Sequence, residues 1–173
     1  AAALAVGGLE ENDGMAEYAL EGVVDFMARN PHWNVNHAGA LCVYTLEFPD
    51  REGSWYCVVN ALLRQKDRSK LTPHLPVFKL MALGVARLPA FCGNVWRGVK
   101  GDVSAVYRAM KDQKKPLREW AFQSTTVDIG VVKAFLGDSV RTLFHIHCAS
   151  GVKIKEFSYY AKEEEVLLLP GTQ

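Results

Sequence analysis

Apolar residues recur at helical spacing through the first half of the chain. From Met15 to Met27 they fall three or four residues apart, as on the buried face of an amphipathic helix, and Asn30-Pro31 would end that helix. The same spacing predicts further helices over residues 38–48, 55–63 and 77–88, the second of them beginning after Ser54 as N-cap. We therefore expect an N-terminal lobe that is mainly helical.

The second half changes character, because short apolar or alternating segments are separated by Gly, Asp and Lys. Strands are predicted at 93–99, 118–124, 142–148, 152–157 and 165–169, and short helices at 103–110 and 128–136. In the strand over 118–124, Trp120 and Phe122 would share one face. Helices followed by strands predict an α+β domain. We expect a single domain over 1–173, mainly helical over 1–92 and mainly β over 93–173.

Composition limits the classes of partner. The 173 residues are 49% hydrophobic and 23% charged, as in an ordinary globular domain. The net charge of +1, from 20 basic and 19 acidic residues, provides no overall field to attract a polyanion, so nucleic acid is not expected as a partner. The apolar run over 80–86 is much shorter than the roughly 20 residues of a bilayer-spanning helix. No membrane span is predicted.

The cysteines and the start of the chain bear on its compartment. Cys42, Cys57, Cys92 and Cys148 lie far apart and form no motif with metal-site spacing, so no zinc site is expected, whereas two disulfides stay open. No asparagine lies in an Asn-x-Ser/Thr acceptor, and residues 1–8 lack a basic leader. We expect an intracellular domain, and a secreted or surface form stays an alternative.

Three consecutive carboxylates, Glu163, Glu164 and Glu165, run directly into the apolar segment 166–169. If this stretch is extended, Glu163 and Glu165 project from one face and Glu164 from the other. Two carboxylates at the start of a buried strand can take different roles in the same reaction. The alternative is that they only keep the entry of the strand soluble.

Two other segments carry polar groups into apolar strands. Arg97 follows Trp96, and its guanidinium needs a polar partner, which a phosphate, a carboxylate or a structural ion pair would provide. Gly98 leaves the neighbouring backbone approachable for a flat ligand. Ser124-Thr125-Thr126 is expected to form an N-cap cluster for the helix over 128–136, and the Ser124 hydroxyl is also placed to hold a catalytic carboxylate.

The order Arg, then Ser-Thr-Ser, then Glu-x-Glu resembles the arginine-directed mono-ADP-ribosyltransferases, which include vertebrate ecto-enzymes and clostridial binary toxins. Residues 95–98 are similar to the family's aromatic-Arg-Gly strand, and 122–126 to its Ser-Thr-Ser strand, with Thr126 in place of the last serine. The resemblance extends over roughly 38–170. It includes Tyr44-Thr45, the segment 56–64 and the closing strands from Gly151 to Leu167. Relatives continue beyond Gln173.

The resemblance implies an ADP-ribosyltransferase fold, in which a helical lobe packs on a split antiparallel-rich β-sandwich with the NAD⁺ cleft between them. It also implies cleavage of NAD⁺ at the nicotinamide bond and transfer of ADP-ribose to a protein arginine, with no metal. An NAD⁺ glycohydrolase using the same site, or an inactive binding module of the same fold, are the alternatives. His145 and His147 have a spacing compatible with metal, but no third ligand is evident.

Residue roles follow from the same resemblance. Glu165 would stabilise the ribosyl cation, and Glu163 would orient or deprotonate the incoming guanidinium. Arg97 would hold a phosphate. The remaining implied roles are binding of NAD⁺ by Ser124 and Thr125, contact of the nicotinamide amide with the Gly98 backbone, and presentation of the acceptor protein by a loop carrying Tyr159 and Tyr160.

Overall fold

The structure, a computed structural model, describes residues 13–112, 118–137, 140–160 and 164–172. The chain divides into two compact units, each described by itself below. The helical unit consists of Ala1–Pro89 and Ile154–Ala161, and the sheet unit of Ala90–Lys153 and Lys162–Gln173. The boundary after Pro89 lies close to the expected change from helices to strands between 92 and 93. The inclusion of residues 154–161 in the helical unit was not predicted, because these residues were expected in the β core.

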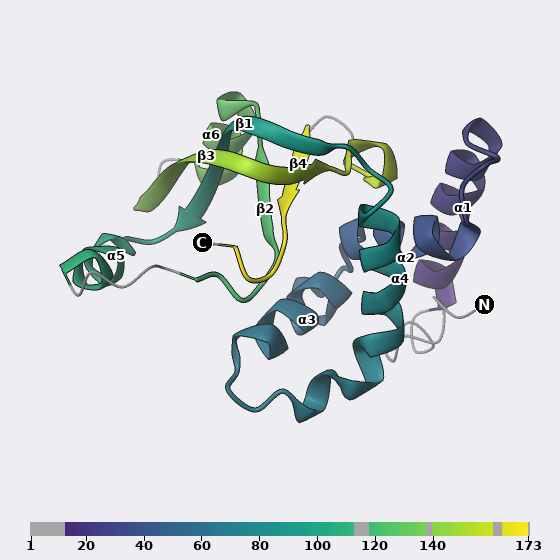
Figure 1. Ribbon diagram of the computed structural model, residues 1–173, viewed down its shortest axis with the longest axis horizontal. Helices are drawn as coiled ribbons and strands as arrows, with labels where there is room; N and C mark the ends of the chain where they lie inside the picture. The colour runs from purple at the N-terminus through teal and green to yellow at the C-terminus, as the bar shows by residue number, and fades with distance from the viewer. Residues whose placement is uncertain (1–12, 113–117, 138–139, 161–163, 173) are drawn as a thin grey trace. The chain divides into compact units, whose positions relative to one another are not determined.

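The helical unit contains α1 (Asp13–Arg29), α2 (Val35–Thr45), α3 (Trp55–Arg64) and α4 (Leu75–Val85), with 3-10 turns η1 (Arg51–Gly53), η2 (Ser69–His74) and η3 (Lys155–Phe157) (Figure 1). The four predicted helices are confirmed, and their ends differ by a few residues. α2 is the central helix, because its residues from Ala38 to Thr45 are all buried. Among the described residues, no helix is long and apolar enough to cross a membrane.

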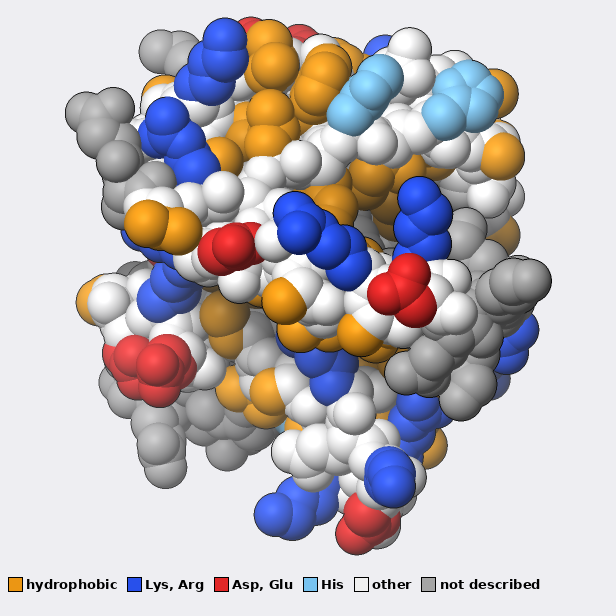
Figure 2. Space-filling view, turned by 90° about the vertical axis from the view of Figure 1, so that its left-hand side faces the viewer, with side chains coloured by type: hydrophobic (Ala, Val, Ile, Leu, Met, Phe, Trp, Pro, Cys, Tyr) orange, Lys and Arg blue, Asp and Glu red, His pale blue; other side chains and the backbone are white. Residues whose placement is uncertain are grey.

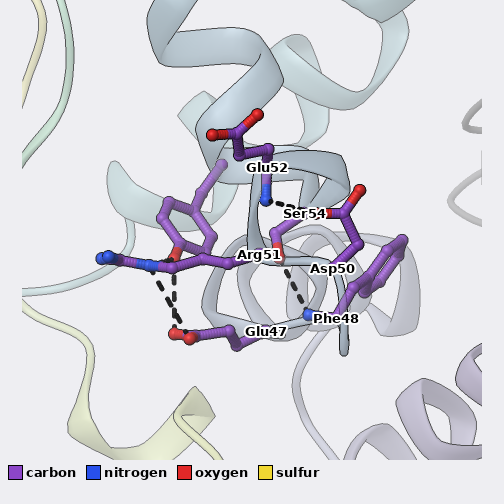
Figure 3. A network of polar contacts seen from close by, with 7 residues as sticks. Glu47, Phe48, Asp50, Arg51, Glu52 and Ser54 are labelled. Atoms are coloured by element: carbon purple, nitrogen blue, oxygen red, sulfur yellow. Dashed lines mark hydrogen bonds and ion pairs between the residues drawn. The ribbon is translucent and has the colours of Figure 1, made fainter.

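Ser54 precedes α3 as predicted, but its side chain does not cap that helix. Its Oγ accepts a hydrogen bond from the backbone N–H of Phe48 at 2.8 Å, and the residue is fully buried. Nearby, Arg51 Nε lies 3.7 Å from Glu47 Oε1, and the two side chains point toward one another (Figure 3). The prediction of a Ser54 cap is therefore corrected: the hydroxyl closes the preceding turn.

The sheet unit contains β1 (Ala90–Lys100), β2 (Gln123–Thr126), β3 (Arg141–Lys153) and β4 (Glu165–Leu168), with α5 (Ser104–Asp112) and α6 (Ile129–Leu136) (Figure 1). Every pairing between these strands is antiparallel, and their order is β1-β2-β4-β3 with β3 returning to β1. The predicted antiparallel sheet is confirmed. The described strands form one closed sheet, which refines the predicted split sandwich.

Three predicted strands differ from the observed ones, and the first of them begins before β2. In place of a strand over 118–124, β2 begins at Gln123, and Trp120 is 44% exposed whereas Phe122 is buried. Glu119 forms an isolated bridge to Thr172 before β2 begins. The two side chains therefore do not share a buried face.

The predicted strands 142–148 and 152–157 are one strand, β3, which continues through Gly151 to Lys153. A Cβ on Gly151 would lie 2.6 Å from Val166 Cγ1 and 2.9 Å from Cys148 Sγ, so this glycine lets β3 pass close to its neighbours. Beyond β3 the chain enters η3 and not a further strand. The glycine at 151 was read as a turn signal, but it serves close packing within a strand.

Candidate active site

Arg97 and Ser124 lie on adjacent strands and are joined directly. Arg97 Nη1 donates a hydrogen bond to the backbone carbonyl of Ser124 at 2.7 Å. β1 and β2 pair through Trp96 and Thr126, and the pairing does not extend to Ser124. The Ser124 carbonyl thus accepts a hydrogen bond from the Arg97 guanidinium at a point where the pairing between β1 and β2 has ended. Arg97 is half-buried and has a polar partner, as its place in an apolar strand requires.

Glu165 begins β4 opposite Thr126 of β2. Residues directly paired across antiparallel strands project from the same face, with Cβ atoms about 4.5–5.5 Å apart. Ser124 lies two residues from Thr126 on β2 and so projects from this face as well. Its diagonal separation from Glu165, about 7–8 Å between backbones, is within reach of a glutamate side chain. The strands thus bring Ser124 and Glu165 to one face of the sheet.

Glu165 is largely removed from solvent. Glu165 is 7% exposed, and Val166, which follows it, is completely buried. Val166 packs on the opposite face in a core cluster with Val95, Cys148 and Leu168. An anionic group with little solvent around it attracts positive charge more strongly than one in water. Such a carboxylate is suited to stabilising a developing cation.

Thr125 has a structural contact of its own. It is 3% exposed, and its hydroxyl donates to the carbonyl of Val166 at 2.5 Å. Because successive residues of a strand alternate, its side chain lies on the face opposite to Ser124. This hydrogen bond ties β2 to β4 directly beside Glu165. Contact of Thr125 with NAD⁺ stays a prediction.

The predicted N-cap cluster over 124–126 is corrected, since these residues form β2. The cap of α6 is Asp128, whose side chain accepts from the N–H of Gly130 at 2.7 Å. Thr126 supports this cap indirectly, because its Oγ1 accepts a hydrogen bond from the backbone N–H of Asp128 at 3.1 Å. The Asp-x-Gly sequence was the signal for this cap, and the run of hydroxyl residues obscured it.

Gly98 is required for packing. A Cβ at this position would lie 2.8 Å from Leu136 Cδ1 and from Val132 Cγ1, both on α6. The absence of a side chain therefore lets α6 pack directly onto β1. This role was not predicted, because the two contacting residues come more than thirty positions later in the sequence. Contact of the Gly98 backbone with nicotinamide stays a prediction.

The other predicted residues before β4 are placed only in part. Glu163 lies outside the described residues. Glu164 has a φ of 47°, in the left-handed region, so the stretch is not extended there and the alternation argument for Glu163 and Glu165 does not apply. Tyr159 is half-buried and Tyr160 is 45% exposed, both within the helical unit. Of the two tyrosines, Tyr160 is therefore the more exposed, and presentation of the acceptor by this loop stays a prediction.

The two histidines of β3 have other partners. The His145 ring stacks on Trp96 with centroids 4.2 Å apart and planes 15° apart, and His147 Nδ1 lies 3.4 Å from Asn94 Oδ1. Figure 2 shows histidine side chains on the same face of the molecule as hydrophobic ones. In the described parts of the chain, no three His, Cys, Asp or Glu side chains gather as metal ligands would. The four cysteines are free thiols.

Comparisons with known proteins identify the family. A family model described as NAD:arginine ADP-ribosyltransferase matches residues 15–173. The NAD(P)(+)--arginine ADP-ribosyltransferase 2 of chicken, Gallus gallus, is 38% identical over 79 residues. That aligned part spans 46% of this chain and only 23% of the chicken protein.

Solved structures agree in fold. The ADP-ribosyltransferase HopU1 of Pseudomonas syringae pv. Tomato DC3000 is 27% identical with a TM-score of 0.67, covering 85% of this chain and 72% of that one. The eukaryotic mono-ADP-ribosyltransferase ART2.2 is 24% identical, also with a TM-score of 0.67, covering 98% of this chain and 74% of that one. The α+β fold of these enzymes is the fold of this chain. The chain belongs to the NAD:arginine ADP-ribosyltransferase family.

Proposed function

We propose that this protein is a mono-ADP-ribosyltransferase, which cleaves the bond between nicotinamide and ribose in NAD⁺ and transfers ADP-ribose to a protein arginine. The observation that carries the proposal is that Ser124 and Glu165 project from one face of the sheet, whereas Arg97, next to Trp96, leaves the adjacent strand β1 on the other face and bonds to the Ser124 backbone. Arg97 is bonded to the Ser124 carbonyl, and Glu165 is buried on the face from which Ser124 projects. Membership of the family supports the same assignment.

The chemistry explains why a carboxylate is central. Nicotinamide in NAD⁺ is already cationic and leaves as a neutral molecule when the electron pair of its bond to C1′ moves onto the ring nitrogen. Positive charge is then left on the ribose, so the site must supply an anion and rigid positioning. The acceptor guanidinium forms the new bond to C1′ through one nitrogen and loses a proton. In this scheme Glu165 stabilises the ribosyl cation, and Glu163 takes the proton.

The remaining groups position the dinucleotide. A guanidinium has five donors in a planar fork, so Arg97 can hold the Ser124 carbonyl and pair with a phosphate of NAD⁺. The Ser124 side chain is exposed and would orient Glu165 and contact NAD⁺. The backbone of Gly98 would bind the nicotinamide amide. We assign the Thr125 hydroxyl to holding β2 on β4, because Val166 already accepts from it.

Known structures of proteins with this fold are consistent with these ligands. ART2.2 variants have been solved with NAD and with NADH, and the ADP-ribosyltransferase Vis with agmatine. Exoenzyme S of Pseudomonas aeruginosa has been solved with carba-NAD and human 14-3-3 protein beta. Agmatine carries a guanidinium, so an arginine acceptor fits this chemistry. For the present chain, NAD⁺ as substrate and a protein arginine as acceptor form part of the proposal.

The test is incubation with NAD⁺ and agmatine, with nicotinamide release and ADP-ribosyl-agmatine both measured. Glu165→Gln should lower both products by roughly a hundredfold or more, the effect of removing one preorganised charged group. Glu164→Gln is the matched control, since it neutralises the adjacent carboxylate, and it should keep the parent rates. Nicotinamide release at the parental rate from Glu165→Gln would refute the assignment. Nicotinamide release without an adduct would indicate an NAD⁺ glycohydrolase.

A further inference from the structure

One face of α4 and of the residue that follows it is exposed and almost entirely apolar. Side chains that share this face by helical spacing are all exposed, and they form the exposed stripe of α4: Leu75, Lys79, Ala82, Leu83 and Ala86. Its two leucines, Leu75 and Leu83, are 53% and 44% exposed. The opposite face, which includes Val77 and Met81, is buried and packs on α2. The helix is therefore apolar on both faces, and the described residues cover only one of them.

The exposed stripe has the composition of a binding surface. A helix that is apolar all round is ordinarily buried, so its open face is expected to meet a partner. Lys79 is the only charged residue of α4, and it lies between Leu75 and Leu83 on the stripe. A lysine in such a place can lay its carbons on an apolar surface while its ammonium stays among polar groups. The stripe therefore suits a partner that is anionic at its surface and apolar beneath it.

The chain around the stripe is strongly basic, although the whole protein carries a net charge of only +1. Within residues 54–89, Asp67 is the only acidic residue. The basic residues of the same stretch are Arg64, Lys66, Arg68, Lys70, Lys79 and Arg87. Exposed acidic residues of the helical unit lie on α1 and around η1, among them Glu21, Asp25, Glu47, Asp50 and Glu52. The near-zero total thus conceals a separation of charge within this unit.

The basic segment 64–70 lies close enough to α4 to assist it. Lys70 is in η2, which leads into α4, and a 3-10 rise of about 2 Å per residue places its backbone about 10 Å from that of Leu75. This distance is close to the Debye length of about 8 Å at physiological ionic strength. Asp67 is engaged locally, because its Oδ1 accepts a hydrogen bond from the backbone N–H of Ser69 at 2.9 Å. Cations of this segment can therefore attract an anionic surface that α4 contacts.

We propose that the exposed stripe of α4 binds the surface of a membrane that contains anionic lipid. Such a bilayer offers anionic headgroups to Lys79 and to the segment 64–70, and apolar chains within about 5–10 Å of its surface to Leu75 and Leu83. Lipids are mobile, so the bilayer needs no groove shaped for a single convex helix. A nucleic acid would pair with the cations but would leave the leucines in water. The alternative occupant is an acidic protein, which the experiment distinguishes.

The test is co-sedimentation of the protein with vesicles of phosphatidylcholine, with and without phosphatidylserine. The parent should bind the vesicles with phosphatidylserine at least about tenfold more tightly, and added salt should weaken this binding. Lys79→Glu should weaken it about thirtyfold, since each unit of charge near the surface contributes about fivefold and the reversal changes two units. Lys111→Glu is the matched control, because it makes the same change of charge at an exposed position of the sheet unit, and it should keep the parental affinity.

The leucines test the apolar part of the surface separately. Leu83→Ala should weaken binding to vesicles with phosphatidylserine about tenfold, because roughly half of the carbons removed would enter the bilayer. Val24→Ala, at a 64% exposed position of α1, is the matched control and should bind as the parent does. Urea denaturation of each variant should give the parental free energy of unfolding, since all these side chains are exposed. A loss of binding would then belong to the surface and not to the fold.

Three results would overturn the proposal: no binding of the parent to vesicles with phosphatidylserine, equal binding to both kinds of vesicle, or equal losses in the variants and their controls. Binding of the parent to polyglutamate, without binding to vesicles, would assign the stripe to an acidic protein and would also overturn it. None of these measurements uses NAD⁺. Failure of this proposal therefore leaves the proposed transferase activity to its own test.

Discussion

The sheet unit and the helical unit both bond buried polar side chains to backbone groups, as Ser54 and Thr45 do in the helical unit, but they differ in what else joins their elements. In the sheet unit, polar side chains bond to the backbone of neighbouring strands, as Arg97 does to Ser124 and Thr125 to Val166. In the helical unit, the interior holds aromatic rings such as Phe26 and Phe157, and side-chain pairs such as Glu47 and Arg51 lie at the exposed edge.

The contrast indicates a division of tasks. Strand register fixes a side chain through its own backbone and its neighbours on both sides, so groups that must act together on one substrate are well placed on adjacent strands. In the helical unit, aromatic packing joins segments that are distant in the chain, as Phe157 does with Phe26. We therefore expect substitutions of the site residues on the strands to alter the chemistry, and substitutions at packing positions of either unit to alter stability.

Among the changes that test this contrast, the largest effect is expected from Arg97→Lys. Lysine keeps the charge but loses the planar fork that can hold a carbonyl and a phosphate together. Loss of charged hydrogen bonds of about 1.5–3 kcal/mol should lower kcat/KM for NAD⁺ roughly ten- to hundredfold. Initial rates at varied NAD⁺ test this, with Arg141→Lys at the exposed start of β3 as control. Equal kcat/KM in parent and variant would show that Arg97 does not hold NAD⁺ in the site.

An intermediate effect is expected from Gly98→Ala. The added methyl would lie 2.8 Å from Val132 and Leu136 and would push α6 away from β1. Such overpacking should lower the free energy of unfolding by about 1–3 kcal/mol, measured by urea denaturation. Gly53→Ala is the control, because its Cβ would meet its nearest neighbour at an ordinary 3.5 Å. An unchanged free energy of unfolding would show that the close approach of Gly98 to Val132 and Leu136 does not hold α6 on β1.

The smallest effect concerns His74 in the helical unit. Trp55 Nε1 donates to His74 Nδ1 at 3.3 Å, and burial holds the pKa of His74 below its ordinary value of 6.5. Below pH 6.5 the unfolded chain therefore takes up a proton before the folded one does, so the free energy of unfolding should fall as the pH drops through that value. A neutral hydrogen bond of this kind contributes about 0.5–1.5 kcal/mol.

The measurement is urea denaturation of the parent and of His74→Gln between pH 7.5 and pH 5. The glutamine does not titrate, so its stability should depend less on pH than that of the parent. His32→Gln, at an exposed position outside the helices, is the control and should keep the parental pH dependence. Equal slopes for parent and His74→Gln would show that Trp55 does not hold a neutral imidazole.

Much of the fold was predictable because local signals agreed with the tertiary structure. The helical spacing over 15–27 and 55–63 led to α1 and α3, and both helices are present. The predictions that were wrong concern positions where a local signal has a second meaning. Ser54 has the chemistry of an N-cap, yet its hydroxyl accepts from Phe48, and Gly151 has the chemistry of a turn, yet it lies inside β3.

The candidate site was predictable in its residues but not in its construction. Arg97, Ser124 and Glu165 stand out in the sequence as polar groups within or beside apolar strands. That they lie on three adjacent strands follows from the pairing of Trp96 with Thr126 and of Thr126 with Glu165. No local pattern encodes such pairings, because each joins segments far apart in the chain.

The amino-acid sequence by itself determined which segments would be helical or extended and which side chains could carry the chemistry, since both depend on residue type and on spacing to near neighbours. Only the tertiary structure decided that Gly98 admits α6, that Gly22 admits Tyr159, and that residues 154–161 belong to the helical unit. Each of these depends on the space left between atoms that are distant in the chain, and packing at that scale is a property of the folded molecule.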